Sequence, residues 1–124
     1  MIILYIFLIS TFVAKAETVQ SLTIEGQKIE FVEFKNLRLL ISKNCLMKNK
    51  LSCEAYRYFE QASHASITQI SPPEIGKELC KKFLGEVVLG KNSTGDQMAI
   101  CKFKKDSSFI DNGSLYSSHF KLAP

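Results

Sequence analysis

The sequence contains only two histidines among its 124 residues, His64 and His119. A serine triad needs a histidine as its general base, and no nucleophile-elbow pattern precedes either residue. His64 lies near the end of an expected helix, and His119 lies close to the C-terminus. We therefore assign no catalytic residue. The alternative hypothesis is a hydrolase that pairs one of these histidines with a carboxylate.

Metal-ligand patterns are also missing from the sequence. No two His or Cys residues have the spacing of a zinc site, and the carboxylates do not cluster as they do in a calcium loop. Asp106 and Asp111 could supply oxygen ligands, but their Ser, Asn and Gly neighbours are typical of two turns. We therefore expect no metal and no cofactor.

Strong net charge and long apolar runs are scarce as well. The net charge of +4 is too small to indicate nucleic acid as a partner. A membrane-active toxin needs a long amphipathic or apolar segment, and after residue 16 the sequence has none. We therefore expect no stable membrane insertion of the mature chain, and a membrane-active toxin is kept as a further alternative.

The first 16 residues, MIILYIFLISTFVAKA, form one apolar block without an acidic residue. The block ends in the small-x-small pattern Ala14-Lys15-Ala16, which is typical of a secretory signal peptide. A retained membrane anchor is the alternative, although the block is shorter than the about 20 residues that span a bilayer. We expect a signal peptide at 1–16, a single small domain at 17–124, and a periplasmic or secreted protein.

All cysteines lie in the expected mature chain. An even number of cysteines in an exported protein indicates disulfides rather than metal ligands. Three pairings are formally possible for the four residues. They are Cys45, Cys53, Cys80 and Cys101.

Hydrophobic periodicity predicts an α+β fold. Period-2 alternation indicates strands, and apolar positions three or four residues apart indicate helices. Strands are expected at 19–25, 27–34, 37–42, 86–92 and 97–103, and helices at 52–66 and 71–85. Residues 42–52 are read as a loop. The expected architecture is a small antiparallel sheet with two short helices, stapled by disulfides.

The face that Cys80 occupies favours one pairing of the cysteines. Cys80 lies beside the apolar stripe of the second expected helix, which includes Phe83 with Leu84 next to it. Cys101 shares a strand face with Phe103, and this face is expected to pack against that helix. We therefore predict the disulfide Cys80–Cys101, which leaves Cys45 to pair with Cys53.

A polar loop after the last expected strand is the predicted binding site. It follows a strand that a disulfide anchors, and it ends in Gly-Ser. The candidate binding residues are Lys104, Lys105, Asp106, Ser108, Asp111, Asn112 and Ser114. Two of them also belong to a set of lysines that could meet a phosphate-rich glycan or a lipid headgroup, or form a solvated face. That set is Lys81, Lys82, Lys102, Lys104 and Lys105.

Residues 72–118 resemble a family of small exported bacterial domains that carry the label haemolysin. The resemblance rests on the proline entry SPPEIGKEL, on Cys80 with Gly85 soon after it, and on Cys101-x-Phe103 followed by a polar turn. The tryptophan that usually follows this turn in the family is absent. The resemblance implies a small exported domain.

These patterns together favour a small exported protein of the bacterial envelope that binds and does not catalyse. Small stapled domains present rigid loops to a partner. We expect a protein or glycan partner in the envelope or outside the cell, including an enzyme that the protein inhibits. The two alternatives above, a hydrolase acting on envelope material and a haemolysin-like toxin, remain open at this point.

Overall fold

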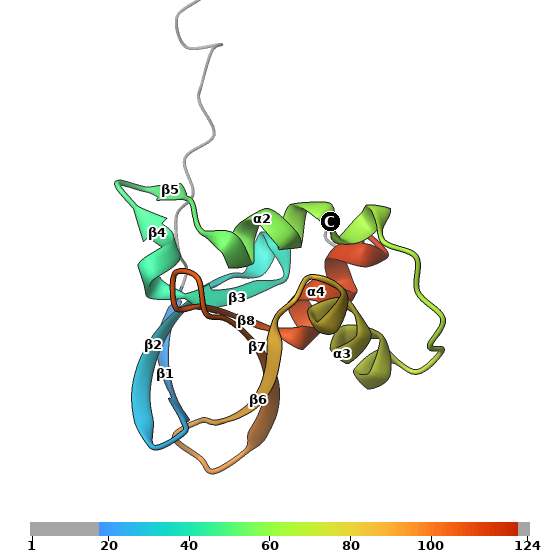
Figure 1. The fold of residues 1–124 in the computed structure, drawn as a ribbon. Helices are drawn as coiled ribbons and strands as arrows, with labels where there is room; N and C mark the ends of the chain where they lie inside the picture. Colours follow the sequence, from blue (N-terminus) through green and yellow to red (C-terminus); the bar gives the residue numbers. More distant parts are fainter. Residues whose placement is uncertain (1–17, 122–124) are drawn as a thin grey trace, which may run out of the picture.

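The computed structural model describes residues 18–121. Six antiparallel strands form a closed barrel (Figure 1). Around the barrel they are β1 (Thr18–Ile24), β2 (Gln27–Phe34), β3 (Leu39–Ser42), β8 (Ser108–Asp111), β7 (Gln97–Phe103) and β6 (Glu86–Lys91). The expected signal peptide lies outside the described residues, so this expectation stays a prediction.

The predicted small sheet with two short helices is wrong, because within residues 18–121 the sheet closes on itself and three α-helices accompany it. Closure depends on two short pairings between strands that are far apart in the sequence. Ile24 lies opposite Gly90 where β1 meets β6, and Ile41 lies opposite Ile110 where β3 meets β8. The α and β content was expected, and the barrel was not.

The residues expected to form a polar loop after residue 103 contain the strand that completes the barrel. Only residues 104–107 form a turn; β8 follows, and α4 (Asn112–His119) begins directly after it. Phe109 packs inside the barrel, whereas Ile110 packs on its outer face beneath the helices. β8 has only four residues and polar ends, which explains why alternation did not reveal it.

The three α-helices lie together on one side of the barrel (Figure 1). They are α2 (Glu54–Gln61), α3 (Pro72–Lys82) and α4. The expected helices are longer than the observed ones. α2 begins after Cys53, and α3 ends three residues before Gly85. The remaining elements are β4 (Leu46–Met47), β5 (Lys50–Leu51) and the 3₁₀ turns Lys35–Leu37, Lys43–Cys45 and Ala62–His64.

The barrel separates two hydrophobic cores. One core fills the barrel, where Phe31 and Phe109 meet with ring centroids 6.2 Å apart. Its buried members are Leu22, Ile24, Phe31, Val88, Ile100 and Phe109. The second core lies between the outer face of the barrel and the helices. It includes Ile41, Phe59, Leu79, Ile110 and Leu115. Because both faces of β3, β7 and β8 are buried, the helices are part of the folded unit.

Both predicted disulfides are present. Cys80 on α3 pairs with Cys101 on β7, and Cys45 pairs with Cys53 at the start of α2. The first bond joins a helix to the barrel, and both of its sulfurs are buried. The second closes the small hairpin that β4 and β5 form. Disulfides of this kind fit an oxidising compartment.

Candidate functional site

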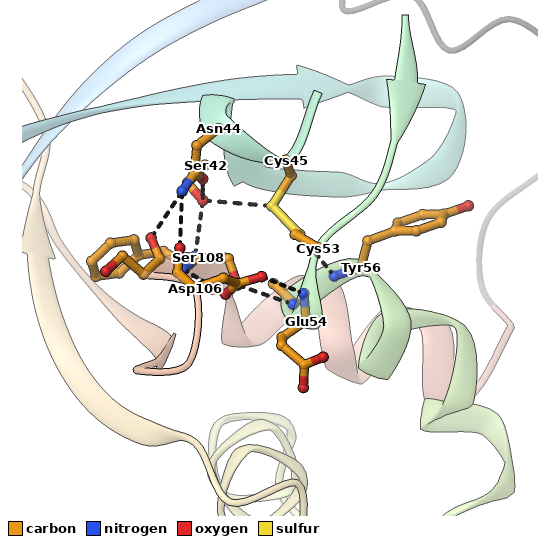
Figure 2. Close-up of a disulfide and its surroundings, with 11 residues drawn as sticks. Ser42, Asn44, Cys45, Cys53, Glu54, Tyr56, Asp106 and Ser108 are labelled. Atoms are coloured by element: carbon orange, nitrogen blue, oxygen red, sulfur yellow. Dashed lines mark hydrogen bonds between the residues drawn. A yellow bond between two sulfur atoms is a disulfide. The ribbon is translucent and has the colours of Figure 1, made fainter. Parts of the chain in front are cut away.

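Asp106 and Ser108, two of the predicted binding residues, hold the first turn of α2 (Figure 2). The backbone N–H of Glu54 donates to Asp106 Oδ2 at 2.8 Å, and the N–H of Ala55 donates to Ser108 Oγ at 3.1 Å. Ser108 Oγ in turn donates to Asp106 Oδ1 at 2.6 Å. The first N–H groups of a helix have no partner inside the helix. The turn after β7 therefore caps a helix that lies about 50 positions earlier in the chain.

Hydrogen bonds on the other side of this turn connect it to β3 (Figure 2). Ser42 Oγ accepts the backbone N–H of Phe109 at 2.9 Å and donates to Asn44 Oδ1 at 2.6 Å. Asn44 Nδ2 donates to the carbonyl oxygen of Ser107 at 3.1 Å. The turn after β7 is therefore fixed from two sides, next to the Cys45–Cys53 disulfide.

The capping role also affects the ionisation of Asp106. Desolvation raises the pKa of its carboxyl, but the hydrogen bonds that it accepts from the Ser108 side chain and from backbone N–H groups, including that of Glu54, outweigh this effect. The pKa of Asp106 consequently lies below its ordinary value. The carboxylate form is thus the one that the fold stabilises.

The remaining polar candidates also take part in the fold. Asp111 caps α4, because its Oδ1 accepts the N–H of Gly113 at 3.2 Å. Burial raises the pKa of Asp111. Ser114 Oγ accepts the N–H of Leu40 at 2.9 Å and so joins α4 to β3. Both polar atoms of the Asn112 side chain are buried without a hydrogen-bond partner among residues 18–121.

Lys104 and Lys105 are exposed and lie at the edge of an open groove of about 530 Å³. Three segments form the groove: the start of α2, the corner between α3 and β6, and the end of β7. Its lining residues are Glu54, Arg57, Tyr58, Phe83, Leu84, Gly85, Glu86, Lys102, Phe103, Lys104 and Lys105. Of the seven binding residues predicted from the sequence, Lys104 and Lys105 are thus the two that line this groove.

Stacked aromatic rings line the groove. The ring centroid of Tyr58 lies 4.6 Å from that of Phe83 and 5.2 Å from that of Phe103, with interplanar angles of 20° and 24°. The guanidinium of Arg57 lies 4.5 Å from the centroid of the Tyr58 ring. These four side chains come from α2, the corner after α3, and β7. Stacking of this kind holds separate elements in a fixed arrangement.

The charges of the groove are only partly paired. Arg57 forms an ion pair with Glu54 at 2.7 Å; this hydrogen bond lowers the pKa of Glu54 and raises that of Arg57. Lys104 Nζ lies 4.0 Å from Glu86 Oε1 with both side chains largely exposed, so this contact contributes little. The set of lysines that the sequence suggested as either a binding patch or a solvated face is divided, because Lys102 Nζ contacts Glu25 Oε1 at 3.0 Å.

The corner between α3 and β6 places Leu84 on the surface, although the sequence pattern predicted it beside a buried stripe. Leu84 is 90% exposed and has a φ of +65°, in the left-handed region. Its N–H donates to the carbonyl of Lys81 at 3.0 Å, and the N–H of Gly85 donates to that of Cys80 at 2.8 Å. This is the Schellman ending of a helix, with leucine at the position that glycine usually occupies.

Gly85 is needed directly after that position. A Cβ at residue 85 would lie 3.0 Å from Cys80 Sγ and still closer to Cys101 Sγ. Glycine is thus required at residue 85, where the backbone passes the disulfide. The residue with left-handed backbone dihedrals at the end of the helix is therefore Leu84 and not a glycine. The sequence signal for this arrangement is KKFLG, in which the glycine follows the end of α3 one residue later than in an ordinary helix stop.

The alternative functions call for a histidine beside a carboxylate or for a membrane-inserting segment, and a cofactor would call for a cluster of metal ligands. None of the ion pairs within residues 18–121 involves a histidine, and His119 Nδ1 lies 2.8 Å from the carbonyl oxygen of Ala62. No group of three or more His, Cys, Asp or Glu side chains there could hold a metal ion. No helix in the described ranges is long and apolar enough to cross a membrane.

The fold and the groove define a class of small antiparallel barrels that are stapled by disulfides and covered by helices on one side. Comparison of the chain with models of protein families, with curated proteins and with solved structures finds no match. The resemblance of residues 72–118 to haemolysin-labelled domains therefore stays a prediction.

Proposed function

We propose that this is a small exported protein of the bacterial envelope that binds a macromolecular partner without catalysis, and that the groove is its binding surface. The observation that carries the proposal is the open, aromatic-lined groove of about 530 Å³. Lys104 and Lys105 at its edge are the candidates from the sequence whose side chains are exposed beside it.

The groove has properties that favour recognition. Tyr, Phe and Arg are enriched at protein interfaces, because rigid aromatic side chains contribute contact area at a small entropy cost. Here Tyr58 and Phe83 are half-buried, and Tyr58 stacks on both Phe83 and the buried Phe103, so the exposed parts of the two outer rings are held in place. The Cys80–Cys101 disulfide holds the corner against β7. A surface that is ordered before binding loses less entropy when a partner docks.

The charges and exposed apolar atoms at the groove favour a protein as the partner. Lys104, Lys105 and Leu84 all line the groove, and all three side chains are exposed. A folded protein offers both an apolar contact for the leucine and carboxylates for the lysines. A glycan or a lipid headgroup offers anionic groups for the lysines but no apolar contact for the leucine. An enzyme that the protein inhibits fits this description.

The proposal is tested by capture of the partner with the mature, oxidised protein from the envelope and secreted fractions of the producing organism. The groove variant carries Lys104→Glu and Lys105→Glu. The control variant carries Lys35→Glu and Lys91→Glu, two exposed lysines that do not line the groove. We expect the groove variant to lose the partner and the control to retain it. Equal capture by both variants would contradict the proposal.

A further inference from the structure

The backbone conformation of Leu84 is unfavourable and has no compensating contact in the core. A left-handed conformation is unfavourable for a non-glycine residue, because it brings Cβ too close to the following carbonyl oxygen. The Leu84 side chain is 90% exposed, so burial does not offset this cost. Among residues 18–121 the other non-glycine residues with positive φ are all polar: Glu25, Arg38, Lys48, Asn49, Ser107 and Lys121. An exposed, strained leucine is therefore exceptional in this chain.

We propose that Leu84 is the anchor residue of the binding surface, and that it inserts into an apolar pocket rimmed by carboxylates on a partner protein. This inference rests on the function proposed above. Gly85 packs against the buried disulfide, so the corner that carries Leu84 has a fixed backbone. A fixed apolar side chain that projects into solvent matches the anchors that dominate protein interfaces, which fill a pocket on the partner.

The charge around Leu84 indicates which kind of pocket on the partner protein it would fit. Exposed basic residues approach the corner from three elements: the last turn of α3, the start of α2 and the turn after β7. They are Lys81, Lys82, Arg57, Lys104 and Lys105. The groove itself is lined by Arg57, Lys104 and Lys105 of this set, together with Lys102 and the acidic Glu54 and Glu86, which leaves four basic against two acidic residues. Lys81 and Lys82 line a neighbouring hollow with Glu74 and Glu78. The excess of positive charge is complementary to a pocket with an acidic rim, and such complementarity guides docking and rejects other partners.

Photo-crosslinking identifies what Leu84 contacts. Benzoylphenylalanine is placed at position 84 of the full chain in the producing organism, and in a control at position 70, where Ile70 is 93% exposed. We expect position 84 alone to give an adduct with one protein, whose crosslinked segment lines an apolar pocket bordered by Asp or Glu. Adducts with lipid, glycan or a second copy of this chain, or identical adducts from both positions, would overturn the inference.

Leu84→Gly separates anchoring from folding, because glycine suits the left-handed position. We expect the melting temperature to rise and capture of the partner to fall about tenfold or more, since the buried leucine contact is lost. A structural role for Leu84 would lower the melting temperature instead. If Leu84→Gly captures the partner like the wild type while the Lys104→Glu, Lys105→Glu variant does not, the anchor is refuted and the proposed function stands. If the lysine variant also captures it normally, the proposed function fails.

Discussion

Gly85 packs so closely against Cys101 that no side chain fits between its Cα atom and the Sγ atom of the cysteine. This contact fixes the corner between α3 and β6 and displaces the left-handed helix ending onto Leu84. The exposed leucine is therefore a consequence of how the backbone passes the disulfide. The stability of the corner and the recognition that we propose for it can consequently be changed independently.

Substitutions at the two corner positions have opposite effects on stability. Gly85→Ala places a methyl group against the disulfide, and overpacking of this kind costs about 1–3 kcal/mol. Leu84→Gly relieves the left-handed strain and should increase the free energy of unfolding by about 1 kcal/mol. Urea unfolding of the oxidised proteins measures both changes. A loss of stability in Leu84→Gly would show that the leucine packs in the fold.

We expect the side chains that cap α2 to contribute to the free energy of unfolding, although Asp106 is exposed. Asp106→Ala removes the acceptor for the N–H of Glu54 and the partner of Ser108. Loss of a helix cap costs about 1 kcal/mol. Chemical denaturation of this variant measures the cost, with Asp96→Ala as the control, because that substitution removes an exposed acceptor of the Thr94 hydroxyl and no helix cap. An effect at Asp106 no larger than at Asp96 would refute the capping role.

Asp106 makes the protein less stable in acid. Its folded-state pKa lies below the ordinary 3.8, because the hydrogen bonds that it accepts outweigh desolvation. Its contribution to stability is therefore fully present above pH 3.8 and is lost as the pH falls through the folded-state pKa. We expect Asp106→Asn to flatten the acid limb of the stability curve measured by denaturant unfolding. An unchanged acid limb would exclude Asp106 as a contributor.

Asp111 affects the pH dependence of stability in the opposite direction to Asp106. Burial raises its pKa above 3.8, so the folded state holds the proton more tightly than the unfolded state does. The contribution to stability is fully present below pH 3.8 and is lost as the pH rises through the folded-state pKa. Asp111→Asn keeps the helix cap. We expect it to be more stable than the wild type at pH 7 and to lose this advantage in acid. An equal difference at both pH values would contradict the prediction.

The local structure followed from the sequence more readily than the closure of the barrel. Alternation in 27–34 and 97–103 revealed β2 and β7, and the shared faces of Cys80 and Cys101 predicted their bond. β8 was missed because a four-residue strand with Ser and Asp at its ends resembles turn chemistry. Without β8 nothing connects β3 to β7, so the sheet could not be seen to close.

The candidate site was predicted only in part, because the contacts that decide its structure also join residues far apart in the sequence. Asp106 and Ser108 have the composition of a recognition loop, but their partners lie on α2, which no local pattern connects to them. Leu84 follows the helical stripe of α3, and the helix ends before it. Its exposure depends on the steric requirement of Gly85 beside a disulfide, which is a tertiary contact.

Hydrogen exchange of the oxidised protein, with and without the captured partner, tests the binding surface most directly. If the groove is that surface, partner binding slows exchange at residues 83–86 and 102–105, and leaves the hairpin end of β6 and β7, residues 92–96, unchanged. Slowed exchange at the hairpin end with no change at the corner would contradict the account.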